Sequence, residues 1–202
     1  MRVYLETERL TLRWLTVADV DNLFALDGDP AVMRYLSGGA PTPREVIARE
    51  ILPRLLSYYE RYDGMYGVWA AIEKASGDFL GWFSFHPQDD GDPGEVALGY
   101  RLRRAAWGKG YATEGARALI RKGFTELGAE RVIATTYQDN LASRRVMEKA
   151  GLTLARTFRL TPADLAAAGT FHTTSQDIWD GDDVEYALSK AAWERQEQER
   201  NE

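Results

Sequence analysis

A glycine-spaced turn between a strand and a helix is the feature that most constrains this chain. In residues 95–102 the larger apolar side chains fall on even positions, which indicates a half-buried strand. From residue 112 to residue 127 apolar residues recur at helical spacing, and Gly128 supplies the stop. Between them, Gly108 and Gly110 leave backbone N–H groups unobstructed, and the following helix adds its positive N-terminal dipole. The segment therefore predicts a turn that holds a phosphate.

A local positive cluster accompanies this turn. Arg101, Arg103, Arg104 and Lys109 stand in a stretch without an acidic residue between positions 100 and 113. Solvated residues at the end of a strand are the alternative interpretation. Together with the glycine turn, the cluster favours a ligand that carries phosphate.

Two common phosphate loops fit this turn poorly. A nucleoside triphosphatase loop needs Gly-Lys followed by Ser or Thr, whereas here Lys109 is followed by Gly110 and Tyr111. A dinucleotide-binding loop needs a third glycine at the position that Thr113 occupies. Both interpretations are therefore weak.

The composition limits the class of protein and its partners. The formal net charge of −6 argues against a nucleic-acid-binding surface, because phosphate backbones favour a basic face. There are no cysteines and only two histidines, so we expect no metal site. The N-terminus has no signal-peptide core, and no apolar run approaches membrane-spanning length. We expect a soluble, cytoplasmic protein that binds neither nucleic acid nor membrane.

Periodicity and helix-start residues predict the remaining elements. Residues 10–14 read as a strand, Thr16 with Asp19 opens a helix, and Asp29-Pro30 starts a short helical turn. A cap, a first-turn proline and a glutamate at 42–45 open a long helix to about Tyr62, kinked near Pro53. Strands 65–73, 78–85 and 95–102 are expected to be antiparallel. Further along we expect a strand at 131–137, a helix at 141–150, a strand at 152–159, a small helix at 161–169 and a last strand at 184–188.

Three motifs, in order along the chain, carry a family resemblance. They are the segments 107–114 (Trp-Gly-Lys-Gly-Tyr-Ala-Thr-Glu), 140–143 (Asn-Leu-Ala-Ser) and 148–152 (Glu-Lys-Ala-Gly-Leu). Together they resemble the GNAT superfamily of acyl-CoA-dependent N-acetyltransferases, and most of all the branch that includes the ribosomal-protein N-terminal acetyltransferases. Segments 7–13 and 183–188 look like the first and last strands of that branch.

The resemblance spans nearly the whole chain and implies its architecture. We expect a single domain over residues 1–202, with a charged tail at 194–202 that frays. The implied fold is the α/β (α+β) GNAT fold, a mixed, mostly antiparallel central sheet of about seven strands flanked by helices.

The resemblance also implies how acetyl-CoA, the cosubstrate, is bound. The backbone of the turn 105–110 cradles the diphosphate, and the residues assigned to it are Trp107, Gly108, Lys109, Gly110, Tyr111, Ala112 and Thr113. Leu102 and Arg103 pair their backbone with the pantetheine arm like an added strand. Asn140 contacts the arm, and Ser143 lies near the thiol. Many family members have Gln or Arg where this chain has Ala105, so the backbone carries the phosphate binding.

The acid and the base are assigned from the same resemblance. Glu95, on the central strand, is the first candidate for the base, and His86 is the alternative. Either also reads as an ordinary surface residue. Many family members have a tyrosine acid where this chain has Met147, and Ser143 is the substitute. The alternative for Ser143 is a serine that satisfies backbone groups in the first turn of its helix.

The expected function is acetyl transfer from acetyl-CoA to a primary amine by direct attack in a ternary complex. The acceptor is a protein N-terminus or a small molecule such as an amino sugar, an amino acid or a polyamine. His172 and the turn 179–182 belong to the acceptor side, where they bind substrate or close a hairpin. A non-catalytic acyl-CoA-binding or sensing module is the alternative. It is supported by Ala105 and Met147, which stand where many family members have functional side chains. A homodimer is one assembly that the sequence allows.

Overall fold

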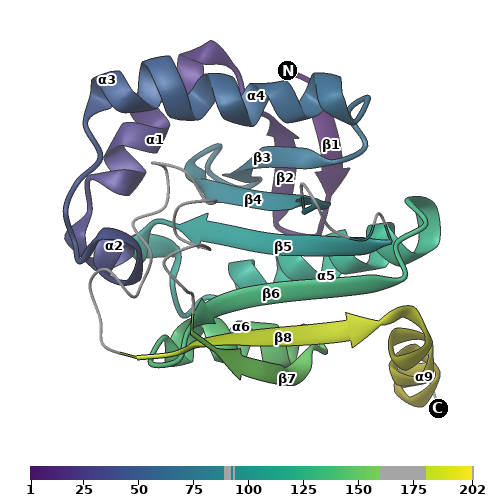
Figure 1. Ribbon diagram of the computed structural model, residues 1–202. Helices are drawn as coiled ribbons and strands as arrows, with labels where there is room; N and C mark the ends of the chain where they lie inside the picture. The colour runs from purple at the N-terminus through teal and green to yellow at the C-terminus, as the bar shows by residue number, and fades with distance from the viewer. Residues whose placement is uncertain (89–91, 93, 160–180, 202) are drawn as a thin grey trace.

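The computed structural model describes residues 1–88, 92, 94–159 and 181–201. One eight-stranded sheet runs through it in the order β1-β2-β3-β4-β5-β6-β8-β7 (Figure 1). The strands are β1 (Val3–Glu6), β2 (Leu10–Trp14), β3 (Gly67–Glu73), β4 (Phe79–Pro87), β5 (Glu95–Leu102), β6 (Arg131–Tyr137), β7 (Thr153–Phe158) and β8 (Asp183–Ser189). All neighbours are antiparallel except β5 and β6. The mixed, mostly antiparallel sheet is confirmed, with eight strands rather than about seven.

Helices cover both faces of this sheet. They are η1 (Val17–Asp19), α1 (Val20–Asp27), α2 (Pro30–Ser37), α3 (Arg44–Val46), η2 (Ile47–Ile51), α4 (Leu52–Arg61), η3 (Arg104–Ala106), α5 (Tyr111–Glu126), α6 (Leu141–Lys149) and α9 (Lys190–Asn201). Leu23, Leu26 and Leu52 from α1 and α4 form one cluster with Val68 and Ala70 of β3. Residues of α5 belong to the larger core cluster, with the aromatic side chains of β4. The sheet is therefore enclosed between two helical layers.

Helix α5 lies unusually close to the sheet. A Cβ at Gly115 would overlap the ring of Phe83, and a Cβ at Gly123 would overlap the ring of Phe85. Both rings are fully buried. The glycines let the helix backbone approach these rings directly, which fixes the start of α5 against the middle of the sheet.

Strands β5 and β6 pair only at one end. Their parallel register joins Glu95 to Arg131, Val96 to Val132 and Ala97 to Ile133, at the start of both strands. Beyond these pairs the two strands diverge, as Figure 1 shows. Backbone pairing is therefore interrupted between the second halves of β5 and β6, and this interruption of the sheet is called the opening.

Two strands depart from the sequence-based expectation. β1 (Val3–Glu6) is an additional edge strand paired with β2. The predicted last strand forms as β8, but it lies between β6 and β7, antiparallel to both. Alternation along a segment predicts a strand but not its neighbour, because pairing partners are distant in sequence.

The long helix begins differently from the prediction and contains a π turn near Pro53. It starts at Arg44, with Pro43 at the N-cap position and no side-chain cap, so Thr42 is not its cap. The helix then passes through a π-helical turn, η2, directly before α4, which holds Pro53 in its first turn. Proline lacks an N–H and excludes the carbonyl four residues back, and a wider turn accommodates both effects. The irregularity that was predicted near Pro53 therefore takes the form of a π turn directly before it.

The C-terminal segment is helical through Asn201. Helix α9 covers residues 190–201. It includes most of the segment 194–202, for which the sequence predicted fraying. The ring of Trp193 lies 5.5 Å from that of Phe124, and Gln196 Nε2 donates to the Gly151 carbonyl at 3.0 Å. The predicted helix at 161–169, His172 and the first half of the turn 179–182 lie outside the described residues.

Candidate active site

The turn before α5 has the backbone shape that the glycine spacing predicts. Gly108 and Gly110 have φ values of 73° and 85°, both in the left-handed region. Gly110 is the N-cap residue of α5, and its carbonyl accepts from the Glu114 amide at 3.0 Å. The turn therefore reverses the chain in a short space and delivers it into the helix.

Amides of this turn are available to a ligand. The amides of Ala106 and Trp107 donate to the carbonyls of Arg103 and Arg104 at 2.8 and 3.0 Å. Within the described residues no protein group accepts from the amides of residues 108–113. The first amides of any helix lack intrahelical partners, and their dipoles favour an anion. The turn therefore fits a diphosphate held by main-chain N–H groups. Residues 107–113 are called the diphosphate loop.

Side chains of the diphosphate loop are used for structure. The Trp107 indole, 47% exposed, donates from Nε1 to the Leu102 carbonyl at 2.7 Å. The buried Tyr111 side chain donates from its hydroxyl to Glu73, and this bond holds the pKa of Glu73 below its usual value. These two large side chains are therefore committed to contacts within the protein.

The free edge of β5 lies beside this loop. Arg103 donates its amide to the Leu80 carbonyl on β4 at 2.7 Å. Because backbone groups alternate along a strand, the amides and carbonyls of Tyr100 and Leu102 point the other way, towards β6. The Leu102 carbonyl accepts from the Trp107 indole, which leaves the Leu102 amide and both backbone groups of Tyr100 for a ligand. Pairing with β6 has already ended at Ala97. An extended ligand with amide groups can therefore add to this edge like a strand.

Helix α6 forms the other wall of the opening. Asn140 is its N-cap residue, and its side-chain oxygen accepts from the Ser143 amide at 3.3 Å. Its Nδ2 donates to Thr136 Oγ1 at 3.0 Å. The Asn140 side chain is thus engaged in shaping the start of α6, next to the opening.

A hydroxyl pair bridges the two walls. The Tyr100 hydroxyl lies 3.0 Å from Ser143 Oγ and donates to the Ser143 carbonyl at 3.1 Å. Burial raises the pKa of Tyr100 to about 12, although the hydrogen bond with Ser143 acts to lower it. The phenol therefore stays protonated at neutral pH. The alternation in residues 95–102 predicts Tyr100 only as a core residue. Its contact with Ser143 spans 43 positions, so no local sequence pattern indicates it.

Met147, which stands at the position of the usual tyrosine acid, is a core residue here. Its side chain is 2% exposed and belongs to the main hydrophobic cluster. Its thioether cannot donate a proton. Ser143 and Tyr100 are the hydroxyl groups that the structure brings to the opening.

Glu95 lies at the opposite end of β5 from the diphosphate loop. Its carboxylate forms an ion pair with Arg131, which also contacts Glu185 at 3.2 Å. Glu185 in turn binds Arg156 at 2.7 Å, so the network joins β5, β6, β8 and β7. At the usual rise of a strand, Glu95 is roughly 16 Å from Tyr100 along β5. The structure does not bring Glu95 and Ser143 together.

His86, the alternative base, lies next to the same end. It pairs in register with Ala97, its Nδ1 is 2.9 Å from the Pro87 carbonyl, and its ring stacks on Tyr58 at 4.3 Å. These contacts place it on β4, near the paired end of β5 and β6. It is not in contact with the hydroxyl pair.

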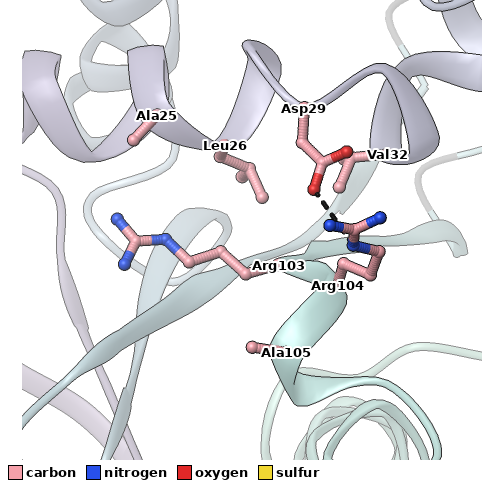
Figure 2. Close-up of a pocket in the computed structure, with 7 residues that line it drawn as sticks. All are labelled: Ala25, Leu26, Asp29, Val32, Arg103, Arg104 and Ala105. Atoms are coloured by element: carbon pink, nitrogen blue, oxygen red, sulfur yellow. Dashed lines mark ion pairs between the residues drawn. The ribbon is translucent and has the colours of Figure 1, made fainter.

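The arginines of the predicted positive cluster point away from the diphosphate loop. Arg101 binds the buried Asp27 at 2.6 Å, and Arg104 lies 3.6 Å from Asp29. Figure 2 shows Arg103 and Arg104 reaching towards α1 and α2, where with Ala25, Leu26, Asp29, Val32 and Ala105 they line a cavity of about 330 Å³. Of the cluster, only Lys109 lies within the loop. The backbone and the helix dipole, rather than the arginines, supply the positive potential there.

The geometry defines a class of binding site. It fits an elongated molecule with an anionic group at the start of α5 and a backbone-like arm along the edge of β5, ending at a hydroxyl pair. Acyl-CoA has this build, so the geometry matches the class of acyl-CoA-binding proteins. Among the described residues no three histidine, aspartate or glutamate side chains gather to hold a metal ion.

Comparison with known proteins gives the family. The family model described as "Acetyltransferase (GNAT) domain" matches residues 9–153, and the chain belongs to this family. YkkB of Bacillus subtilis (strain 168) is 35% identical over 158 residues, which cover 77% of this chain and 88% of YkkB. An Aspergillus fumigatus protein named FsC-acetyl coenzyme A-N(2)-transacetylase is 32% identical over 198 residues, covering 95% of this chain and 78% of that protein.

A solved structure shows the same fold. RimL, a ribosomal-protein alpha-N-acetyltransferase solved with coenzyme A, superimposes with a TM-score of 0.72 over 93% of this chain and 98% of RimL, at 18% identity. The resemblance read from the three motifs is confirmed. The chain is an acyl-CoA-dependent acetyltransferase whose cosubstrate is acetyl-CoA. In the part of the chain that the structure describes, no helix is both long and apolar enough to cross a bilayer.

Proposed function

We propose that this protein transfers the acetyl group of acetyl-CoA to a primary amine by direct attack in a ternary complex. The observation that carries the proposal is the run of available amides at residues 108–113, beside the free edge of β5. Holding both substrates in line makes the reaction effectively intramolecular, which accounts for most of the expected acceleration. A covalent enzyme intermediate is not needed.

The binding roles follow from the contacts. The diphosphate loop holds the diphosphate through its amides, as expected for Trp107 through Thr113, except that the Trp107 amide already bonds to Arg104. Tyr100 offers its amide and carbonyl to the pantetheine arm, and Leu102 offers its amide, since its carbonyl accepts from the Trp107 indole. Arg103 contributes less than expected, because its amide bonds to β4. Asn140 acts by capping α6.

Ser143 is the proposed acid. The departing thiolate, whose conjugate acid titrates near 8.5, takes a proton from Ser143 Oγ. The Tyr100 hydroxyl lies 3.0 Å from Ser143 Oγ, and it stabilises the resulting serine oxygen by turning its proton from the Ser143 carbonyl to that oxygen. A proton from solvent then restores Ser143. The acylated amine carries away the acetyl group, and free thiol is the other product.

The amine must lose a proton before or during attack, because primary amines are largely protonated at neutral pH. Glu95 remains the proposed base, with His86 as the alternative. Both lie towards the paired end of β5 and β6, so either acts through a chain of water molecules rather than by direct contact.

The acceptor we favour is a primary amine on a small molecule. The relative that is 32% identical over nearly the whole chain is named an N(2)-transacetylase, whereas the ribosomal-protein acetyltransferase shares 18% identity. The first alignment covers 95% of this chain at the higher identity, which supports this choice. A protein N-terminus is the second candidate.

Release of free thiol from acetyl-CoA over a panel of amines tests the proposal. We expect turnover with at least one small primary amine and sequential kinetics with both substrates. Tight binding of acetyl-CoA without turnover on small amines or N-terminal peptides would instead support the non-catalytic sensing module.

A further inference from the structure

The turn between β1 and β2 contacts the diphosphate loop through the side chain of Arg9. Arg9 donates from Nη1 to the Lys109 carbonyl at 2.9 Å. A Cβ built on Gly110 would lie 3.3 Å from Arg9 Nη2, and the guanidinium carbon lies 4.5 Å from the centre of the Tyr111 ring. Arg9 therefore binds Lys109, lies over the ring of Tyr111 and stands beside Gly110 between them.

The contact with Lys109 matters for anion binding. A carbonyl carries a partial negative charge, so a loop that presents amides to an anion must turn its carbonyls away. The hydrogen bond from Arg9 fixes the Lys109 carbonyl on the side of β2. The amides that follow it are then left for the ligand.

Arg9 also holds a carboxylate that stands in the first turn of α5. Glu114 accepts from the Arg9 amide at 2.8 Å, from Arg9 Nε at 2.7 Å and from the Thr7 hydroxyl at 2.6 Å. Its side chain is 18% exposed and forms an ion pair with Arg9 Nη2 at 2.6 Å. Burial acts to raise the pKa of Glu114, but the hydrogen bonds from Thr7 and Arg9 outweigh it and hold the pKa below its usual value. Glu114 is therefore ionised at neutral pH.

An ionised carboxylate this close to the amides would repel a diphosphate unless a cation compensates it. We propose that Arg9 is a positioning residue for the diphosphate loop, which turns the Lys109 carbonyl away from the bound anion and compensates the charge of Glu114. The inference rests on the proposed binding of the acetyl-CoA diphosphate by this loop. Motif matching did not find Arg9, because its partners lie 100 to 105 positions away.

The first test removes the charge. In Arg9→Met, the dissociation constant of coenzyme A measured by calorimetry is expected to rise about tenfold, since a charge-assisted contact is lost and Glu114 is left uncompensated. In the double variant Arg9→Met with Glu114→Gln, the logarithm of the dissociation constant is expected to return more than halfway to its wild-type value. A purely structural role predicts no recovery, because the second substitution removes further hydrogen bonds.

The second test removes the diphosphate from the donor. Acetyl-pantetheine carries the thioester but no diphosphate, so its kcat/KM is expected to stay within about twofold of wild type in Arg9→Met. With acetyl-CoA as donor, KM rises while kcat is retained. Equal losses with both donors, or an unchanged coenzyme A affinity in the folded variant, would overturn the role of Arg9.

Two more variants keep the test decisive. Arg2→Met is the matched control, since Arg2 stacks on Trp14 at 3.6 Å and is expected to leave coenzyme A affinity unchanged. If Arg9→Met fails to fold, Arg9→Lys retains the charge but cannot bond Lys109 and Glu114 together, and an intermediate loss of affinity is expected. Wild-type protein that binds no coenzyme A would reject the proposed function itself, which separates the two failures.

Discussion

Single residues shape the diphosphate loop, and they do so through the backbone. A Cβ at Gly108 would meet nothing within 4 Å, so this glycine is required by its left-handed conformation rather than by space. Gly115 in α5 is required for the opposite reason, because the Phe83 ring lies against it. Gly108 and Gly110 therefore set the backbone shape that a ligand meets, whereas Gly115 lets α5 pack closely against the sheet.

Replacing Gly110 by Asp is expected to weaken coenzyme A binding more than tenfold, about 1.4 kcal/mol. The substitution strains a residue with a φ of 85° and brings a carboxylate next to Arg9, where it competes with the Lys109 carbonyl and Glu114 for the guanidinium. Calorimetric titration measures the effect. Gly128→Asp is the matched control, because Gly128 has a φ of 73° and open space around it at the far end of α5. An affinity for coenzyme A that is unchanged in Gly110→Asp would count against the loop.

Ser143→Ala is expected to lower kcat about 100-fold while the dissociation constant of coenzyme A stays unchanged. Tyr100→Phe is expected to give a smaller loss, about tenfold, because it removes only the hydrogen bond to Ser143. Since the pKa of Tyr100 is raised to about 12, its loss leaves the shape of the pH–rate profile below that pH unaltered. Steady-state kinetics across pH measures both effects. Full kcat in Ser143→Ala would show that Ser143 only completes the first turn of α6.

Glu95→Gln is expected to lower kcat by at least tenfold at neutral pH, with coenzyme A affinity intact. The loss should shrink as the pH rises, because the amine then arrives neutral. His86→Gln is the comparison that separates the two candidate bases. If Glu95→Gln keeps full activity but loses thermal stability, Glu95 serves only the ion-pair network with Arg131 and Glu185.

At the scale of elements, a buried ion pair joins β2 to the helices that follow it. Arg13 binds Asp19 through two hydrogen bonds, at 2.6 and 2.8 Å, and the Asp19 side chain is 3% exposed. Asp19 also accepts from the Thr16 amide at 2.9 Å, which fixes the start of η1. The predicted pairing of Thr16 with Asp19 is thus confirmed, and Arg13 is the partner that local sequence did not indicate.

Asp19→Asn is expected to lower the free energy of unfolding by roughly 3 kcal/mol, because it leaves the Arg13 charge without its partner. Burial acts to raise the pKa of Asp19, but hydrogen bonds from Arg13 and Asn22 hold it below its usual value. The stabilisation is therefore complete above about pH 4 and is lost as the pH falls through the lowered pKa. Denaturant titrations at several pH values measure it. The variant should lose this part of the acid dependence, and a variant with wild-type stability would contradict the assigned role.

Elements with strong local patterns could be predicted from the sequence. Alternation gave β3, β4, β5 and β6, and helical spacing gave α5 with its stop at Gly128. Two features could not be read in this way. The π turn before Pro53 depends on how the whole helix accommodates a proline, and the position of β8 depends on which strands meet after the chain has folded.

At the scale of the whole molecule, the site forms where distant segments converge on the opening between β5 and β6. The diphosphate loop was predicted because its glycines, its strand and its helix are contiguous in sequence. The pairing of Tyr100 with Ser143 and the support from Arg9 were not, because they join residues 43 and more than 100 positions apart. The same limit explains why Arg101 and Arg104 were assigned to a positive cluster. Their carboxylate partners, Asp27 on α1 and Asp29 just after it, lie too far away in sequence to be counted with them.

The central claim is that the amides of residues 108–113 bind the diphosphate of acetyl-CoA. A crystal structure of the protein with coenzyme A tests it most directly. We expect diphosphate oxygens about 3 Å from at least two of these amide nitrogens, with the pantetheine arm along the free edge of β5. A diphosphate bound elsewhere, or loop amides that pair with protein carbonyls while coenzyme A is bound, would contradict the account.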